Sequence, residues 1–198
     1  MGNRGLVIAV LVAALAAAIA VFAAWRIGAF GGAEPPPAVG GPFQMVDQTG
    51  KPQTEQMLNG RWSAVFFGYT FCPEACPTTL TTLAKAQDLL GPKAKDLQVV
   101  FVTIDPARDT AAQLKTYLSS AAFPKGSIGL TGTPAQVAAI AKAYHVYYQK
   151  SGSGPDYAMD HSTALYLMDP RGRFDKVIAY GVTPEEMARQ IADAMRGR

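Results

Sequence analysis

Residues 64–80 read AVFFGYTFCPEACPTTL, and they indicate a strand that leads through a loop with two cysteines into a helix. Its first five residues form a short apolar run typical of a buried strand, and a helix is expected over about Pro77–Leu90. A strand that leads straight into a helix is the building unit of α/β proteins. In such proteins, sites form at the carboxyl ends of strands, and Cys72 and Cys76 lie at this one. The junction therefore predicts both the fold class and the place of the functional site.

Strands and helices alternate along the chain beyond this junction. Further strands are expected over residues 97–104, 127–130, 163–168 and 173–180. Helices are expected to begin after Thr110, Thr133 and Thr183, because Gln or Glu follows each of them three residues later, as in a capping box. Helical crossovers between strands imply a partly parallel sheet that is covered by helices.

Two hairpins complete this pattern. Residues 42–54 (PFQMVDQTGKPQT) predict two short strands around a Gln-Thr-Gly turn. Near the end of the chain, residues 169–172 (Asp-Pro-Arg-Gly) are a turn signal that pairs the last two strands antiparallel. The expected fold is therefore α/β, with a central mixed sheet flanked by helices and an N-terminal β-hairpin extension.

An uncharged apolar segment precedes the domain. Residues 5–25 carry no charged side chain, and about 20 such residues span a bilayer core as a helix. A cleaved signal peptide is the alternative, although its apolar region usually has only about 7 to 15 residues. Either interpretation exports the domain. We expect a cytoplasmic tail at residues 1–4, a transmembrane anchor at 5–26, a Pro/Gly linker at 27–42 and a folded domain at 43–198.

The charge balance argues against one class of partner. The 18 basic and 15 acidic residues give a net charge of +3, the two signs are mixed, and the sequence has no basic block. A nucleic-acid-binding role therefore has no electrostatic basis here. Because exported proteins can form disulfides, the two cysteines are interpreted as a structural bridge, a redox pair or metal ligands.

The position of the cysteines favours chemistry over a structural role. A cysteine at the start of a helix lies near the positive end of the helix dipole, which favours the thiolate. The thiolate is the form that attacks disulfides and binds metals. Cys72 and Cys76 are four residues apart, so they lie on one face if the helix includes both. A structural bridge more often joins distant segments, since closing a longer loop stabilises more.

Three motifs, in their order and spacing, resemble the Sco/SenC family. They are GYTFCPEACPTTL at 68–80, FVTIDPARDT at 101–110 and DHSTALYLMDPRGRF at 160–174. Members of this family are thioredoxin-fold copper chaperones for the assembly of cytochrome c oxidase, and they usually carry an N-terminal anchor. The resemblance covers roughly residues 41–182. It implies a thioredoxin-like fold that binds copper, as Cu(I), Cu(II) or both.

The same resemblance assigns roles to individual residues. It implies that Cys72 and Cys76 are the copper-binding thiols and that His161 is the third ligand. The two cysteines are also expected to act as a redox-active pair that can close into a disulfide. The family more often has Asp-Val between its cysteines, where this chain has Glu74-Ala75. Neither change touches a ligand, and the glutamate keeps the charge.

The surroundings of His161 agree with a ligand role. It follows a flexible Gly/Ser segment at 150–155 and precedes a buried strand, so its side chain can face a neighbouring site. Thiolate and imidazole together suit copper in both oxidation states. Asp156 and Asp160 are expected to orient the imidazole or an approaching partner, with turn or cap duty as the alternative. The other histidine, His145, is interpreted as a structural or surface residue.

The loop after the second long strand contains Asp105, Arg108 and Asp109. Two roles stay open for these residues. They either brace the loop and the helix start at Thr110, or dock a partner protein.

Three functions of different classes are compatible with these residues. The first is a copper-binding chaperone that delivers copper to the copper-site subunit of cytochrome c oxidase. The second is a thiol–disulfide oxidoreductase that reduces the copper-site cysteines of that subunit, and the third is a peroxidase or a structural domain. A dedicated oxidoreductase more often has two residues between its cysteines, and a peroxidase would not need His161. Metal binding is therefore favoured, while enzyme activity stays open.

The resemblance also implies partners and a location. The expected partners are the oxidase subunit, other copper chaperones or thioredoxin-like reductants, and the membrane. The expected location is the bacterial inner (cytoplasmic) membrane, with a single-pass anchor and the soluble domain on the periplasmic side. The arginines that flank the apolar segment favour an amino terminus on the inside.

Overall fold

The computed structural model describes residues 3–26 and 39–197 of the chain. The expected linker at 27–42 therefore lies outside the described residues except for its last four positions. The first two residues of the expected tail lie outside them as well.

One helix in the described part of the chain is long and apolar enough to cross a membrane. Helix α1 spans Asn3–Arg26 and contains the 19-residue apolar segment Gly5–Ala23. None of this segment is buried against other protein elements. Its apolar residues lie on every side of the helix, which suits a lipid environment better than an aqueous one.

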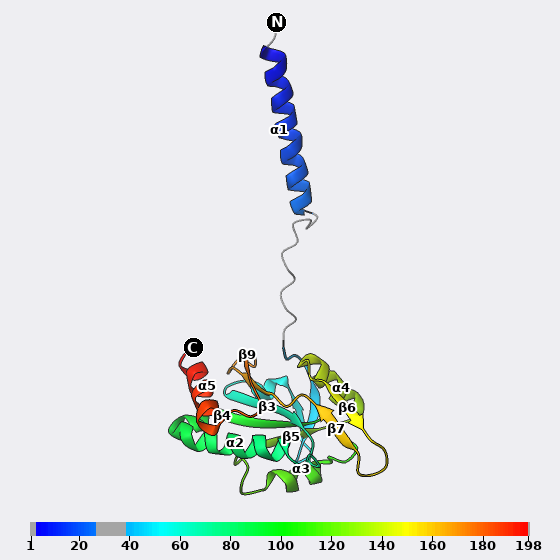
Figure 1. The fold of residues 1–198 in the computed structure, drawn as a ribbon, viewed down its shortest axis with the longest axis vertical. Coiled ribbons are helices and arrows are strands. Elements are labelled where there is room, and N and C mark those ends of the chain that lie inside the picture. Colours follow the sequence, from blue (N-terminus) through cyan, green and yellow to red (C-terminus); the bar gives the residue numbers. More distant parts are fainter. Residues whose placement is uncertain (1–2, 27–38, 198) are drawn as a thin grey trace. The chain divides into compact units, whose positions relative to one another are not determined.

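A seven-stranded mixed sheet forms the centre of the domain (Figure 1). Its strands are β1 (Gln44–Asp47), β2 (Pro52–Thr54), β3 (Trp62–Gly68), β4 (Leu97–Thr103), β5 (Ile128–Thr131), β8 (Leu165–Met168) and β9 (Phe174–Ile178). Their order in the sheet is β2-β1-β5-β4-β3-β8-β9. Strands β3, β4 and β5 are parallel, and the other pairs are antiparallel. The predicted mixed sheet and both predicted hairpins are confirmed.

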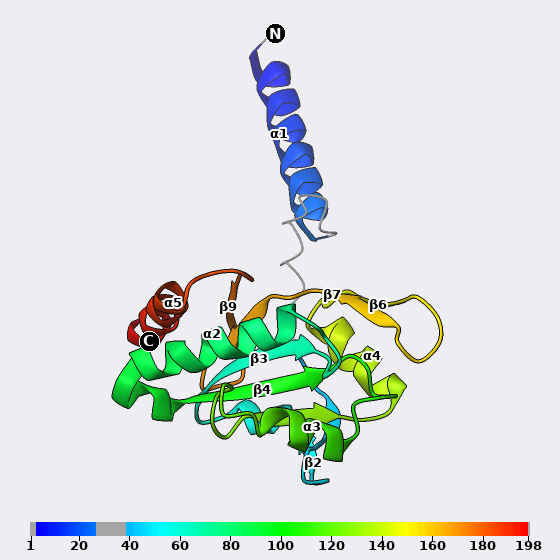
Figure 2. The ribbon, with the colours of Figure 1, turned by 60° about the horizontal axis from the view of Figure 1, so that its bottom comes forward.

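Helices cover both faces of this sheet. They are α2 (Ala75–Leu90), α3 (Ala111–Leu118), α4 (Pro134–Ala143) and α5 (Pro184–Arg196), with short 3-10 helices at Glu55–Leu58 and Gly91–Asp96. Apolar side chains of α2, α3 and α5 pack together on one face, whereas those of α4 pack on the other. Figure 2 shows α2 running alongside β3 and β4. The predicted α/β architecture of a covered sheet is thus confirmed.

The predicted helix starts are confirmed at all three threonines. The hydroxyl oxygens of Thr110, Thr133 and Thr183 each accept a hydrogen bond from the backbone N–H three residues later. Only Thr133 has the full reciprocal capping box, because the Gln136 side chain accepts a hydrogen bond from the Thr133 N–H. Each cap satisfies a helix N–H that would otherwise have no partner in the helix.

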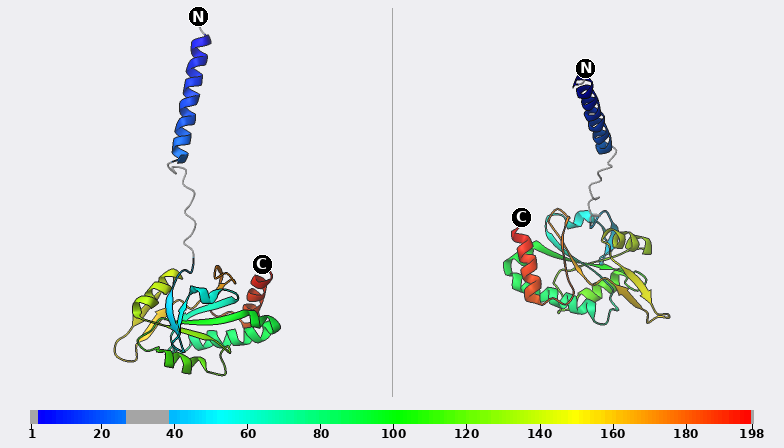
Figure 3. Two further views of the ribbon diagram at one scale, coloured as in Figure 1. Left: turned by 180° about the vertical axis from the view of Figure 1, so that it is seen from behind. Right: turned by 45° about the horizontal axis from the view of Figure 1, so that its top comes forward.

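A second, two-stranded sheet was not predicted. Strands β6 (Tyr148–Ser151) and β7 (Ala158–His161) pair with each other in a hairpin that is separate from the central sheet. The expected flexible segment at 150–155 is in fact the end of β6 and the start of the turn. The right-hand view of Figure 3 shows this hairpin projecting from the body of the domain. Both strands are mostly exposed, so they lack the apolar alternation that marks a strand in sequence.

The sheet topology brings three connecting segments together at one end of the central strands. The carboxyl ends of β3 and β4 lie side by side, with Gly68 opposite Thr103. Strand β8 runs antiparallel to β3 and begins there, with Leu165 opposite Phe66. The loops that follow β3 and β4 therefore meet the segment that leads from β7 into β8.

Candidate metal centre

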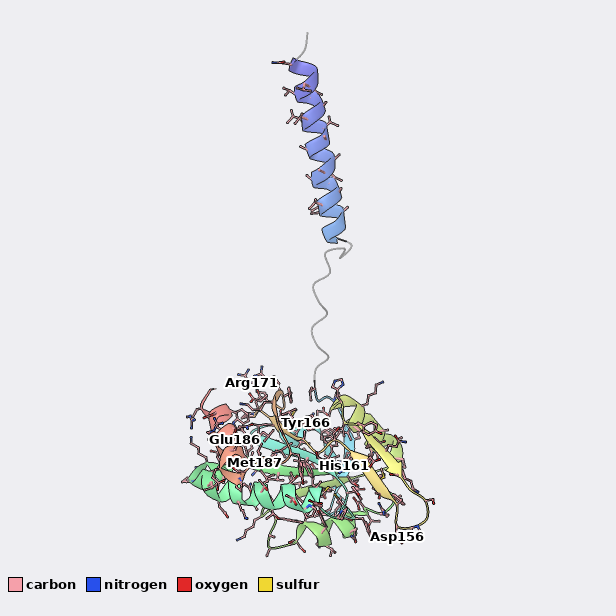
Figure 4. The ribbon with its side chains drawn as sticks, viewed as in Figure 1. Asp156, His161, Tyr166, Arg171, Glu186 and Met187 are labelled. Atoms are coloured by element: carbon pink, nitrogen blue, oxygen red, sulfur yellow. The ribbon has the colours of Figure 1, made fainter. Side chains whose placement is uncertain are left out.

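Two cysteines and a histidine meet at this end of the central strands. The ligand atoms of Cys72, Cys76 and His161 all lie within 4.8 Å of one another. The Sγ atom of Cys76 is 3.7 Å from Nε2 of His161, although 85 positions separate them in sequence. Figure 4 shows His161 toward the middle of the domain, where β7 ends. Among the residues that the structure describes, this is the group whose Cys, His and carboxylate ligand atoms are close enough to share a metal ion.

The cysteines occupy different structural elements. Helix α2 begins at Ala75, two residues before the predicted start, so Cys76 lies in its first turn. Cys72 lies in the preceding loop, and its Sγ accepts a hydrogen bond from the Cys76 N–H at 3.3 Å. The helix does not include both cysteines, so their spacing does not place them on one helical face. Cys72 instead folds back across the helix amino terminus, whose free N–H groups stabilise negative charge.

Close packing holds Cys76 in place. Its side chain is fully buried, and a β-carbon added at Gly68 would lie 2.7 Å from its Sγ. The same added atom would lie 3.1 Å from the ring of Phe101. Strand β3 therefore ends on a glycine because a larger residue would displace the thiol. Cys72 is partly exposed, so the candidate site has one inner and one outer sulfur.

A backbone hydrogen bond orients the imidazole of His161. Its Nδ1 lies 2.9 Å from the carbonyl oxygen of Ser162. Because a carbonyl oxygen only accepts, Nδ1 carries the proton, and the lone pair of Nε2 faces Cys76. The ring of Tyr69 stands edge-on to the imidazole, with 5.8 Å between ring centres. This tautomer and orientation are those required for metal binding through Nε2.

The two thiols differ in their tendency to ionise. Hydrogen bonding from the Cys76 thiol lowers the pKa of Cys72 to about 4, and this outweighs the opposing effect of burial. The neighbouring His161 side chain and hydrogen bonds from the N–H groups of Cys76 and Glu74 add to the lowering. The hydrogen bond to Cys72 and burial together raise the pKa of Cys76. The reduced site thus contains a Cys72 thiolate and a Cys76 thiol that donates to it.

This difference predicts how Cys72 reacts with iodoacetamide. An ordinary thiol has a pKa near 8.5. Below that pH, its alkylation rate rises about tenfold for each unit by which the pH increases, because the thiolate fraction rises. Cys72 is already a thiolate above pH 5, so its alkylation rate should stay constant between pH 5.5 and 7.5. Buried Cys76 should stay unmodified over the same period. Mass spectrometry of timed samples measures both rates, and the urea-unfolded chain provides the control. A tenfold rise per pH unit in the folded protein would contradict the prediction.

Asp109 holds the cysteine loop in place. Its carboxylate is fully buried and accepts hydrogen bonds from the N–H and hydroxyl of Thr70, at 3.0 and 2.7 Å, and from the hydroxyl of Thr103 at 2.7 Å. Burial raises the pKa of this carboxyl, and the hydrogen bonds from Thr103 and Thr70 oppose the rise. Of the two roles open for this loop, the geometry of Asp109 is that of a brace between the end of β4 and the cysteine loop.

The other predicted polar residues lie outside the ligand cluster. Asp156 and Asp160 are exposed, and Asp160 points to the opposite face of β7 from His161 because neighbouring side chains of a strand alternate. A role for these carboxylates in orienting the imidazole stays a prediction. In the structure it is the Ser162 carbonyl that bonds to His161, a contact that backbone atoms make and side-chain sequence cannot signal. His145 is exposed, and it adopts the left-handed conformation with φ of 55°.

The ligand spacing fits a single copper ion. Metal–sulfur bonds of about 2.3 Å and metal–nitrogen bonds of about 2.1 Å place two ligands of one ion roughly 3.5 to 4.6 Å apart. The 3.7 Å between Cys76 and His161 falls in this range. The largest spacing in the group, at most 4.8 Å, exceeds the range by only a few tenths of an ångström. Two sulfurs and one imidazole nitrogen also form a donor set that suits copper.

The chain has relatives among known proteins. A family model described as SCO1/SenC matches residues 31–196. Protein SenC of Rhodobacter capsulatus is 42% identical over 154 residues, which cover 77% of this chain and 69% of that protein. The mitochondrial Protein SCO1 homolog 1 of Arabidopsis thaliana is 41% identical over 141 residues, or 70% of this chain. The chain spans only 42% of the length of that plant protein.

The fold also resembles solved structures. The structure of Bradyrhizobium japonicum ScoI with copper bound superposes with a TM-score of 0.72 at 42% sequence identity. The superposition covers 80% of this chain and 99% of that one. The predicted thioredoxin-like architecture is therefore that of solved Sco proteins.

Proposed function

Because the chain belongs to the SCO1/SenC family, we propose that it is a copper chaperone that delivers copper to the copper-site subunit of cytochrome c oxidase during assembly. Copper is the cargo, held by Cys72, Cys76 and His161. The observation that carries the proposal is the convergence of their three ligand atoms within 4.8 Å. A second copper chaperone would supply the metal.

The difference in exposure between the ligands suits transfer of the metal. A chaperone must bind its cargo firmly and yet let a partner's ligands reach it. Cys76 is buried and fixed in the first turn of α2, whereas Cys72 is partly exposed in a loop. A partner can therefore approach from the side of Cys72 and exchange ligands there first. Three protein ligands also leave the copper open to a fourth, incoming ligand.

Helix α1 gives the chaperone a membrane anchor. Its 19-residue apolar segment is long enough for one crossing. We place the domain on the periplasmic side of a bacterial inner membrane, with a single-pass anchor. This location brings the copper site to the compartment where a membrane oxidase receives its metal. It also makes thiol redox chemistry possible for the cysteine pair.

Thiol–disulfide exchange is the second candidate function. It is favoured by the lowered pKa of about 4 and the partial exposure of Cys72. The Cys72 thiolate would attack a disulfide of the oxidase subunit and form a mixed disulfide, releasing one thiolate of the subunit. Cys76 would then lose its proton and attack Cys72 Sγ, releasing the second. The subunit gains two electrons, the cysteine pair becomes a disulfide, and a thioredoxin-like reductant must restore it.

A copper titration of the reduced, full-length chain in detergent micelles tests the chaperone proposal. Removing a group that only hydrogen-bonds to a metal ligand typically weakens metal binding by about 10- to 100-fold. We expect His161→Ala to weaken copper binding by more than this, because it removes a ligand itself. It should also shift the Cu(II)–thiolate absorption. Competition with a chelator of known affinity measures the binding constant.

The second histidine of the chain supplies a matched control. His145→Asn should leave affinity and spectrum unchanged, since His145 is exposed and asparagine tolerates its left-handed backbone. If His161→Ala binds copper like the unmodified chain and has the same spectrum, His161 is not a ligand. If the unmodified chain itself binds no copper, the chaperone proposal is wrong.

A further inference from the structure

Arg108 lies between the two segments that supply the metal ligands. Its guanidinium carbon is 3.6 Å from the ring centre of Tyr157 and 4.7 Å from that of Phe71. Phe71 immediately precedes Cys72, and Tyr157 immediately precedes β7, the strand that ends at His161. One arginine therefore contacts both the cysteine loop and the β6–β7 hairpin.

Two polar contacts fix this arginine, and a third fixes the carboxylate to which it binds. Its Nε lies 2.5 Å from the carboxylate of buried Asp105, and its Nη1 donates to the carbonyl of Pro155 at 3.3 Å. The Tyr157 hydroxyl donates to the other oxygen of Asp105 at 2.7 Å. We call Arg108, Asp105, Tyr157 and Phe71 the Arg108 clamp. It joins the loop after β4 to the hairpin and to the residue before Cys72.

The hairpin needs such a fastening. Strands β6 and β7 pair only with each other, so the central sheet does not fix the hairpin by strand pairing. At its base, the backbone of Tyr147 bonds to Ser162, next to His161. Toward its turn, the contacts with Arg108 tie Pro155 and Tyr157 to the body of the domain. Tyr148 and Met159 pack against the core between these two points, so the contacts with Arg108 are what fastens the turn end of the hairpin.

The clamp is not arranged for stability alone. The side chain of Arg108 is only 15% exposed, and its Nη2 is buried without a hydrogen-bond partner among the described residues. A buried, unsatisfied guanidinium nitrogen is unfavourable for folding. The planar guanidinium nevertheless lies over the rings of Tyr157 and Phe71, a contact that a lysine ammonium cannot make in the same way.

We propose that Arg108 is a positioning residue of the copper site, which holds the β6–β7 hairpin so that His161 faces the cysteines before the metal arrives. The inference rests on the proposed function and refines it. Binding is strengthened by the fraction of molecules in which the third ligand is already in place. Arg108 touches neither the metal nor its ligand atoms and acts through the hairpin that ends at His161.

The proposal predicts a limited and conditional loss of affinity. If the fraction with His161 in place falls to about one tenth, copper affinity falls about tenfold. The loss cannot exceed that of His161→Ala, because only the histidine contribution depends on the clamp. In a His161→Ala background, Arg108→Gln should therefore have no further effect. A general structural role would weaken binding equally in both backgrounds.

The test is a double-mutant cycle with copper itself, using the full-length chain in detergent micelles. Arg108→Gln, His161→Ala and the double variant are titrated against a competing chelator, and the Cu(II)–thiolate spectrum is recorded for each. We expect Arg108→Gln to shift the spectrum toward that of His161→Ala and to lower affinity about tenfold, and the double variant to equal His161→Ala. Arg108→Lys should resemble Arg108→Gln, because it keeps the charge but loses the stacked plane.

Arg173 offers a matched control. Arg173 forms an ion pair with buried Asp169 at 2.8 Å. This pair lies at the β8–β9 turn, at the opposite end of the strands from the site. Arg173→Gln should leave copper affinity and spectrum unchanged. If Arg108→Gln does not fold, Tyr157→Leu removes the stacked ring from the hairpin side and takes its place in the cycle.

The outcomes separate this inference from the proposed function. Unchanged affinity and spectrum in Arg108→Gln, with a clear effect of His161→Ala, would overturn the positioning role alone. An equal loss from Arg108→Gln in both backgrounds would also overturn it. A His161→Ala variant that binds like the unmodified chain would instead overturn the ligand set.

Discussion

Cys76→Ser abolishes tight copper binding, with an expected loss of more than about 10³-fold. Structural zinc sites bind with about 10–16 kcal/mol for four ligands, or roughly 3 to 4 kcal/mol for each ligand. Because 1.4 kcal/mol corresponds to a factor of ten, the loss of one thiolate is worth about 10² to 10³. Serine does not ionise near neutral pH and is a hard oxygen donor, so copper should discriminate against it even more strongly.

The shape of the site makes serine the informative substitution. Cys76 is fully buried against Gly68, where no added atom fits, and a serine side chain is no larger than the cysteine it replaces. The fold should therefore persist while the sulfur is lost. Chelator competition measures the affinity, and circular dichroism checks the fold.

Thr79→Ala is the control for packing in the same helix. Thr79 is buried in α2, three residues beyond Cys76, and its hydroxyl donates to the Ala75 carbonyl at 2.8 Å. This variant removes a buried polar group of the helix without touching a ligand, so copper affinity should be retained. Nearly full affinity in Cys76→Ser would show that Cys76 is not a ligand.

Oxidation of the cysteine pair is expected to prevent copper loading, again by more than about 10³-fold, since two thiolate ligands are lost together. A disulfide removes both sulfur charges and leaves His161 as the remaining ligand. Loaded copper should in turn protect the pair from oxidation. Titrating the reduced and the oxidised form of one preparation with copper tests both statements, and re-reduction of the oxidised form, which should restore loading, provides the control.

The structure changes how a disulfide between Cys72 and Cys76 is expected to form. With both cysteines in one helix, closing a disulfide would strain the first turn. Cys72 instead lies in the loop before α2, so loop movement can bring its sulfur to Cys76. We expect a bridge that is reducible by thioredoxin-like proteins. Full-affinity copper binding by the oxidised form, or a reduction potential below about −300 mV as in inert structural disulfides, would contradict this prediction.

Local sequence signals predicted most elements of the domain. The threonines that begin α3, α4 and α5 act on backbone groups within one turn, so their effect can be read from neighbouring residues. The apolar runs of β3 and β4 are buried on both faces, and such runs are recognisable without knowledge of the fold. The exposed β6–β7 hairpin has no such pattern and was missed.

The donor types of the candidate site are readable from local sequence alone. The sequence supplied two thiols at a strand–helix junction and a histidine ahead of a later strand, and their motifs identified the family. How these groups meet depends on the three-dimensional fold, because β8 lies antiparallel beside β3 and brings residue 161 to the cysteine loop. The fold also decided which nitrogen of His161 faces the thiols and which thiol ionises first. Distances, tautomers and pKa values depend on neighbours that are remote in sequence, and the Arg108 clamp, which joins three loops, is of the same kind.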